Sequence, residues 1–213
     1  MSVPRIAAKL AFVALFCAEA ALGGPPSARQ DEARSLAEQA FAARREADRL
    51  ENGWDAAYDR GFALANQAIA LDPGFADAYY AAFLNLGQKS ERRGIGSQMA
   101  NLSQLRSLLD RTLELDPHHA HAWEAKGEML LRLPRLMGGS RREGYGALRR
   151  SPERAPQWAK PPLRLAELYW KNGRTDEARA EALRARDLAR AAGDEDHLRD
   201  AEALLKQMDV QIP

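Results

Sequence analysis

The sequence predicts an all-α protein built from repeated helical hairpins. Alanine, leucine, arginine and glutamate dominate its 213 residues and β-branched residues are scarce, a balance that favours helix because unbranched side chains lose little rotamer freedom there. From Asp31 onward the apolar residues follow a helical period. Three segments also match one another when Pro73, Pro117 and Pro156 are aligned. Internal matches of this kind indicate an α-solenoid of stacked units.

Residues 1–23 have the three parts of a secretory signal peptide. Arg5 and Lys9 form a positive start, Leu10–Ala18 is an uncharged apolar run, and small residues follow up to Gly23. The apolar run is too short to span a bilayer, which needs about 20 residues. We therefore expect cleavage after Ala20 or Gly23, a periplasmic or secreted mature protein, and no stable membrane insertion after cleavage.

The only cysteine, Cys17, lies inside this segment. Lipidation of Cys17 is an alternative, although Phe16 stands where a small residue is wanted, and an uncleaved N-terminal anchor is another. A mature chain cut after Gly23 has no cysteine, which excludes disulfides and thiol catalysis. The net charge of +1, from 31 basic and 30 acidic residues, argues against nucleic-acid binding, because that binding needs an excess of clustered cations.

Residues 24–30 (GPPSARQ) read as a short, stiff linker before the repeats. Within the repeats each aligned proline should end one helix, and Tyr79, Trp123 and Leu163 open the next, since proline can begin a helix but cannot continue one. Small residues recur where two helices of a unit must touch closely, in the first helix at Gly127 and Ala166 and in the second at Gly61, Gly144 and Ala178.

These features resemble the tetratricopeptide repeat (TPR), a helix-turn-helix unit of about 34 residues. The best match is the last unit, with Leu165–Tyr169, Asn172–Arg174 and Asp176–Ala178. The resemblance implies a right-handed α-solenoid of three to four units over residues 31–193. Residues 194–213 should form a capping helix and tail, because Leu198, Ala201, Leu205 and Met208 share one helical face.

The spacing between the aligned prolines predicts two insertions. Pro73 and Pro117 are 44 residues apart, and Pro117 and Pro156 are 39 apart, against a repeat of about 34. We place the extra length at 87–102 and 133–139, as loops on the rim of the solenoid. The first would present Lys89, Arg92 and Arg93, and the second would present Arg135, Arg141 and Arg142. Ser140 and Glu143 form a capping box, so a helix should begin there. The segment before this helix is either a purely structural turn or a site where the exposed backbone N–H groups bind an anion.

The first helix of each unit should line the concave groove where TPR proteins bind peptides. The repeat register places the following residues on that face: Tyr80, Leu84 and Gln88; His121, Glu124, Glu128 and Arg132; and Glu167, Trp170 and Lys171, with Asp77 and Leu163 beside them. We expect Trp170 to be the main anchor, because aromatic residues contribute heavily to interfaces. The alternative for Trp170 is burial against the capping helix.

The remaining motifs do not indicate catalysis. His118, His119 and His121 cluster after Pro117, but they lack a metal-ligand spacing such as HExxH, and we interpret them as a polar turn. No nucleophile motif and no phosphate-binding loop occurs. The sequence predicts no enzyme activity, no cofactor and no bound metal.

We therefore expect an exported adaptor that binds a protein or peptide partner in the cell envelope, with self-association left open. Two alternatives remain. The segments Leu113–Pro117 and Leu133–Ser140 resemble the periplasmic T-component of TRAP transporters, which implies an accessory role in solute uptake. An apolar ligand carried inside the solenoid is the other alternative.

Overall fold

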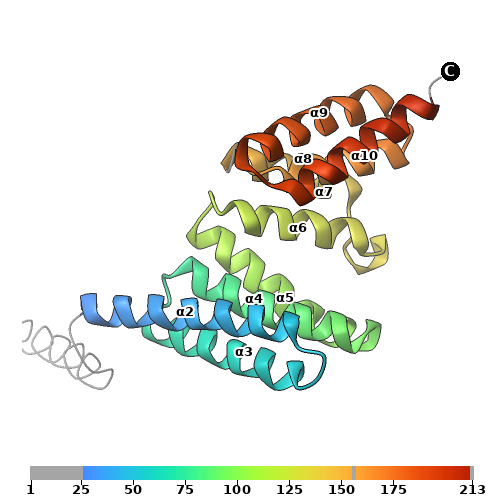
Figure 1. Ribbon diagram of the computed structural model, residues 1–213. Coiled ribbons are helices and arrows are strands. Elements are labelled where there is room, and N and C mark those ends of the chain that lie inside the picture. Colours follow the sequence, from blue (N-terminus) through green and yellow to red (C-terminus); the bar gives the residue numbers. More distant parts are fainter. Residues whose placement is uncertain (1–25, 155–156, 212–213) are drawn as a thin grey trace, which may run out of the picture. The chain divides into compact units, whose positions relative to one another are not determined.

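The computed structural model describes residues 26–154 and 157–211, and every regular element in these ranges is helical (Figure 1). The predicted signal peptide and Pro156 lie outside the described residues. Two compact units divide between Leu115 and Asp116. The first unit contains α2 (Pro26–Arg49), α3 (Trp54–Leu71), α4 (Ala76–Arg93) and α5 (Ile95–Leu115). The second contains α6 (Ala120–Arg132), the short 3₁₀ helix η1 (Arg135–Met137), α7 (Arg141–Arg154), α8 (Lys160–Lys171), α9 (Thr175–Ala192) and α10 (Glu195–Gln211).

The prolines mark repeat boundaries as predicted. At Pro73 the chain turns from α3 into α4, and at Pro117 it turns from α5 into α6. The two turns use the same contacts. The preceding aspartate accepts a hydrogen bond from the backbone N–H two residues on, at 2.9 Å in one turn and 2.8 Å in the other. In each turn the proline carbonyl also accepts a hydrogen bond from an aromatic side chain, Tyr79 at 3.2 Å and Trp123 at 2.9 Å.

An arginine from the second helix then lies over each of these aromatic rings. The guanidinium carbon of Arg111 is 5.9 Å from the ring centre of Tyr79, and that of Arg150 is 4.6 Å from Trp123. Two turns in separate units thus repeat the same Asp-Pro, aromatic and arginine arrangement. This recurrence confirms that the matching segments are structural repeats.

In the first unit the helices pack through alanines. Ala40, Ala65, Ala81 and Ala82 are fully buried where α2, α3 and α4 meet. Small side chains allow the backbones to approach closely, so Asn85 Nδ2 of α4 reaches the carbonyl oxygen of Ala40 in α2 at 3.1 Å.

In the second unit Gly127 of α6 and Gly144 of α7 face each other. A Cβ on Gly144 would lie 2.6 Å from Leu131 Cγ and 3.2 Å from the Gly127 carbonyl oxygen. This confirms that these glycines permit close packing of the two helices of a unit. Tyr169 fills the aromatic position of the last repeat and stacks on Tyr145 with ring centres 5.3 Å apart.

The C-terminal helix α10 caps the second unit as predicted. Ala201 and Met208 are fully buried, Leu205 is nearly so, and α10 packs on α9 and α8. Its polar residues remain on the outer side, as a solenoid terminus requires.

Two expectations about irregular segments were wrong. Residues 26–30 belong to the start of α2, where we expected a linker. Residues 87–102 form no rim loop, because α4 continues to Arg93 and α5 starts at Ile95 with Gly94 alone between them. The extra length therefore extends both helices of the hairpin. The other insertion lies between α6 and α7, where we expected it, and contains η1.

Candidate functional site

In the second compact unit, α6 and α8 are the first helices of two successive repeats. Ion pairs join the two helices across one surface, which we call the α6/α8 face. Lys160 Nζ lies 2.9 Å from Glu124 Oε1, and only 8% of the Glu124 side chain is exposed. Arg164 Nε lies 2.6 Å from Glu128 Oε1, and Arg164 also pairs with Glu167. The two acids of α6 are four residues apart, as are the two bases of α8, so one turn of each helix matches one turn of the other.

The acids of the face act on the pKa of Arg164. Burial lowers the pKa of Arg164, but hydrogen bonds and attraction from Glu128 and Glu167 outweigh it and leave that pKa above its ordinary value. Arg132 extends the network, with Nε 3.5 Å from Glu128 Oε2. On the α6/α8 face, acidic and basic side chains are therefore paired with each other.

Of the residues predicted for the groove, Glu128, Arg132 and Glu167 are brought together around Arg164, and Glu124 forms a separate pair with Lys160 on the same face. Sequence analysis missed their partners Lys160 and Arg164. The matching four-residue spacing in the two helices was the available signal, but it becomes specific only when α6 and α8 are known to be neighbours.

An aromatic pair adjoins the charged network. The rings of His121 and Trp158 meet edge to face with centres 4.1 Å apart, and His121 is exposed. Trp158 comes just before α8 and was not among the predicted site residues. His119 has a different role, because its Nδ1 accepts a hydrogen bond from the Ala122 N–H at 3.1 Å and caps α6. The histidines thus contribute to a helix start and an aromatic contact, and no group of three potential ligands in the described part of the chain is placed to hold a metal.

The last predicted groove residues divide between surface and core. Lys171 is exposed, whereas Trp170 is half-buried and packs against the core cluster that contains Leu148 and Tyr169. Leu163, which we also projected onto the groove, is buried against Ala185 of α9 and belongs to the core.

In the first unit, the expectation that Tyr80 lines a groove was wrong. Only 8% of Tyr80 is exposed, and its ring lies 6.3 Å from that of Phe41 in α2 and 6.0 Å from that of Phe83. The close packing of α2 on α4 covers this face of α4. Leu84 and Gln88 are half-buried further along the same helix.

Lys89, Arg92 and Arg93 are not free rim residues either, because they bind the first hairpin. Lys89 pairs with Asp55 and Asp59 of α3, and Arg93 also pairs with Asp55. The guanidinium of Arg92 donates to the carbonyl oxygens of Ala47 at 3.0 Å and Leu50 at 3.1 Å, at the C-terminal end of α2. These three basic side chains tie α4 to the preceding hairpin.

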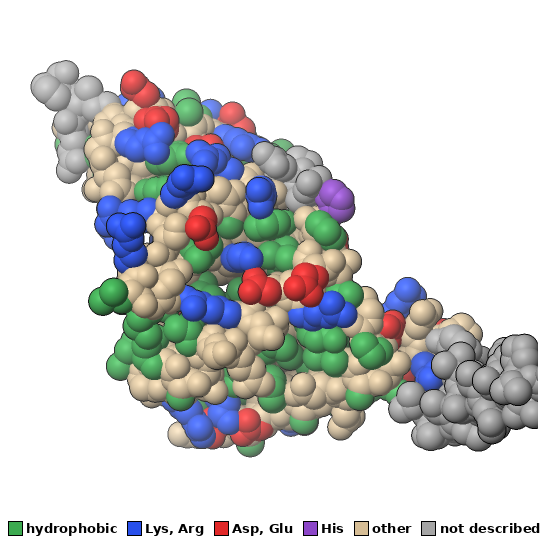
Figure 2. Space-filling view, turned by 180° about the vertical axis from the view of Figure 1, so that it is seen from behind, with side chains coloured by type: hydrophobic (Ala, Val, Ile, Leu, Met, Phe, Trp, Pro, Cys, Tyr) green, Lys and Arg blue, Asp and Glu red, His purple; other side chains and the backbone are tan. Residues whose placement is uncertain are grey.

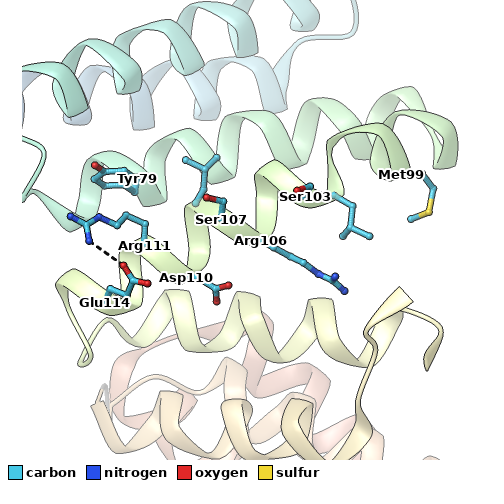
Figure 3. Close-up of a pocket in the computed structure, with 10 residues that line it drawn as sticks. Tyr79, Met99, Ser103, Arg106, Ser107, Asp110, Arg111 and Glu114 are labelled. Atoms are coloured by element: carbon cyan, nitrogen blue, oxygen red, sulfur yellow. Dashed lines mark hydrogen bonds and ion pairs between the residues drawn. The ribbon is translucent and has the colours of Figure 1, made fainter. Parts of the chain in front are cut away.

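A pocket of about 820 Å³ lies along α5 in the first unit (Figure 3). At one end Arg111 donates to Glu114 at 3.0 Å beside the ring of Tyr79, and Met99 lies at the other end. Hydrogen bonds to Glu114 and Tyr79 raise the pKa of Arg111. No motif in the sequence predicted this pocket, whose lining mixes apolar side chains with serines, acids and bases.

The loop between α6 and α7 encloses a second pocket, of about 810 Å³, which includes Arg135, Arg141 and Arg142 in its lining. All three arginines are exposed. Ser140 Oγ accepts a hydrogen bond from the Glu143 N–H at 3.3 Å, so the predicted cap of α7 is present.

The space-filling view shows acidic and basic side chains lying side by side, with hydrophobic side chains between them (Figure 2). Such interleaving fits the near-zero net charge. None of the described helices combines the length and the hydropathy that a membrane span requires.

No family model matches this chain, and none of the curated proteins searched is significantly similar to it. Solved structures do resemble it. PilF of Pseudomonas aeruginosa has a TM-score of 0.55 at 14% identity, over 85% of this chain and 78% of that one. MamA (TM-score 0.49, 17% identity, 65% of this chain and 72% of that chain) and the MamA fragment 41-end from Desulfovibrio magneticus RS-1 (0.48, 15%, 80% and 93%) are more distant in structure. The likeness to PilF, together with the repeated hairpins, confirms the predicted fold: the chain is a TPR-like α-solenoid.

Proposed function

We propose that this protein is a non-catalytic, exported scaffold that binds a segment of another protein on the α6/α8 face. The observation that carries the proposal is the TPR-like stacking of α6 and α8, which presents His121, Trp158 and a row of charged side chains on one surface. Repeat scaffolds of this type commonly serve as extended binding surfaces.

The chemistry of the face supports a polypeptide as its ligand. The pair of Arg164 with Glu167 is the exposed one, and exposed ion pairs contribute little to stability, so a partner can exchange it for its own at small cost. The pair of Lys160 with Glu124 stays in place, because the acid is buried. The His121–Trp158 pair offers an aromatic contact of the kind that anchors interfaces. Alternating charges also select the register of a segment that carries complementary charges.

The binding surface is tested by photo-crosslinking in cells. A photoreactive amino acid replaces the exposed His121 in the tagged full-length protein, and in a matched control it replaces the exposed Ala180 on α9. We expect one defined protein to be crosslinked from position 121 and absent from the control. Equal crosslinking from both positions, or none from position 121, would contradict the proposed face.

Specificity is tested by adding Trp158→Ala to the crosslinking variant. Because Trp158 is only partly buried and lies outside the helices, the substitution should leave the fold intact while it removes the aromatic anchor. We expect the crosslinked band to weaken several-fold. An unchanged band would mean that the partner is held elsewhere on the molecule.

Export is proposed from residues 1–23 alone and has a separate test. The tagged full-length protein should appear in the periplasm or medium with a new N-terminus after Ala20 or Gly23, and deletion of residues 1–23 should retain it in the cytoplasm. Recovery of the intact N-terminus in the membrane fraction would instead favour the anchored form. The transporter-subunit alternative is not favoured by the comparisons.

A further inference from the structure

We propose that the loop from Leu133 to Arg142, here called the arginine loop, binds an acidic peptide segment of a second protein that carries a large apolar side chain. This surface is distinct from the ion pairs of the α6/α8 face, and the inference therefore does not depend on the proposed function. Three features of the loop support it: its rigidity, its unpaired positive charge and a fully exposed leucine.

The loop is held in one conformation by its own backbone. The carbonyl oxygen of Pro134 accepts hydrogen bonds from the N–H groups of Met137 at 2.9 Å and Gly139 at 3.0 Å. The Ser140 N–H donates to the Leu130 carbonyl at 3.0 Å. Gly139 is packed so closely that an added Cβ would lie 1.8 Å from the Leu133 carbonyl oxygen. A preorganised loop loses little entropy when it binds.

The positive charge of the loop has no ion-pair partner among the described side chains. Arg135, Arg141 and Arg142 make no ion pair with any residue whose side chain the structure describes. Arginines elsewhere in the unit do pair, as Arg179 does with Asp209 and Arg190 with Glu202. Three arginines against one glutamate, Glu143, give the pocket lining an excess of positive charge. Guanidinium groups favour bidentate contacts with carboxylates, so the loop fits an acidic ligand.

The apolar part of the surface indicates a peptide instead of a small anion. Leu136 is fully exposed at the turn of the 3₁₀ helix, and Leu130, Leu131 and Pro134 line the adjoining pocket. Because the backbone bonds hold the turn in place, Leu136 stays in water unless a partner covers it. A free phosphate would use the arginines and leave this apolar surface exposed. The pocket of about 810 Å³ is large enough to accept a side chain.

The inference is tested with a phage-displayed library of random short peptides. The library is selected on the chain without residues 1–23 and counter-selected on the Arg141→Glu/Arg142→Glu variant. We expect the enriched peptides to carry Asp or Glu close to Leu, Phe or another large apolar residue. Fluorescence anisotropy with the enriched peptide then measures Kd for each variant.

The variants separate charge from apolar contact. Arg141→Glu/Arg142→Glu should raise Kd about tenfold or more and should abolish most of its salt dependence. Leu136→Ser should raise Kd roughly tenfold with the salt dependence unchanged. Arg45→Glu/Arg49→Glu is the charge-matched control, because both arginines are exposed on α2 of the other unit, and its Kd should stay near that of the parent.

Several results would overturn the proposal. Enriched peptides without acidic residues, or equal affinity for the double reversal, would remove the role of the arginines. Displacement of the peptide by millimolar inorganic phosphate with no effect of Leu136→Ser would assign the loop to a small anion. Arginine-dependent binding to vesicles of phosphatidylglycerol and phosphatidylcholine in equal amounts, with no peptide enriched, would assign it to a membrane surface.

Discussion

The close approach of α6 and α7 makes two neighbouring glycines respond differently to the same substitution. Gly144 and Gly146 both lie in α7. A Cβ added to Gly144 would meet Leu131 Cγ at 2.6 Å, Leu131 Cδ2 at 3.0 Å and the Gly127 carbonyl oxygen at 3.2 Å, whereas a Cβ on Gly146 meets nothing within 4 Å. Gly146→Ala is therefore an internal control for Gly144→Ala.

The expected magnitudes follow from these distances. In each variant alanine gains about 1 kcal/mol of helix propensity over glycine. At position 144 overpacking opposes this gain by about 1–3 kcal/mol, because the Leu131 side chain can turn aside but the Gly127 carbonyl cannot. We expect Gly146→Ala to increase the free energy of unfolding by up to about 1 kcal/mol. The free energy of unfolding of Gly144→Ala should be about 1–3 kcal/mol lower than that of Gly146→Ala.

Urea denaturation followed by circular dichroism measures this difference, with the midpoint of the second unit taken separately if the two units unfold in steps. The double variant Gly144→Ala/Leu131→Ala gives a further check. Shortening Leu131 removes the two closest contacts, so the added Cβ should cost less in that background than in the parent. Equal stability of the two single alanine variants would refute the packing that we assign to α6 and α7.

Three further predictions concern the C-terminal helices. Met208→Ala should lower the free energy of unfolding by about 2–5 kcal/mol, because this side chain is fully buried on the inner face of α10. In the same urea titration Val210→Ala, on the exposed face of α10, should change the free energy of unfolding by less than about 0.5 kcal/mol. Burial raises the pKa of Glu181, although Arg184 and Arg149 oppose the shift. The free energy of unfolding should therefore fall as the pH rises from the unfolded pKa, about 4.3, through the higher folded pKa. Glu181→Gln should therefore stabilise the protein at neutral pH and lose this advantage below that window; a gain that persists in acid would contradict the assignment. Hydrogen bonds from the backbone and side chain of His197 lower the pKa of Asp194, and the stability they give is present above the unfolded pKa of about 3.9 and is lost as pH falls through the folded value. Asp194→Asn should remove this acid-dependent loss in urea titrations at several pH values, and an unchanged pH profile would argue against it.

The predicted groove shows which features of the surface the sequence alone could not predict. The repeat register placed Glu124, Glu128 and Glu167 on the surface of the first helices, and there Glu128 and Glu167 share Arg164 while Glu124 pairs with Lys160. The same register placed Tyr80 there, yet α2 covers it. A helical period indicates which residues share a face, but the number of neighbours packed on that face depends on helices distant in the sequence.

The basic segment Lys89–Arg93 illustrates the same limit. Its charges, and Gly94 and Gly96 that follow it, suggested a loop, but the residues continue α4 because Lys89, Arg92 and Arg93 find partners on α2 and α3. Tertiary contacts override local preference in such a segment. No sequence pattern within the segment identifies those partners.

The sequence by itself determined the all-helical class, the turns at Pro73 and Pro117, the glycine contact of α6 with α7 and the buried face of α10. Each of these depends on local backbone restriction or on the spacing of neighbouring residues. The tertiary structure alone decided that Lys160 and Arg164 pair with acids 36 residues earlier, and that Leu136 remains exposed beside arginines that form no ion pair with a described side chain. Pairing and exposure are set by which helices pack together, because burial and electrostatic attraction act between residues that are close in space and need not be close in sequence.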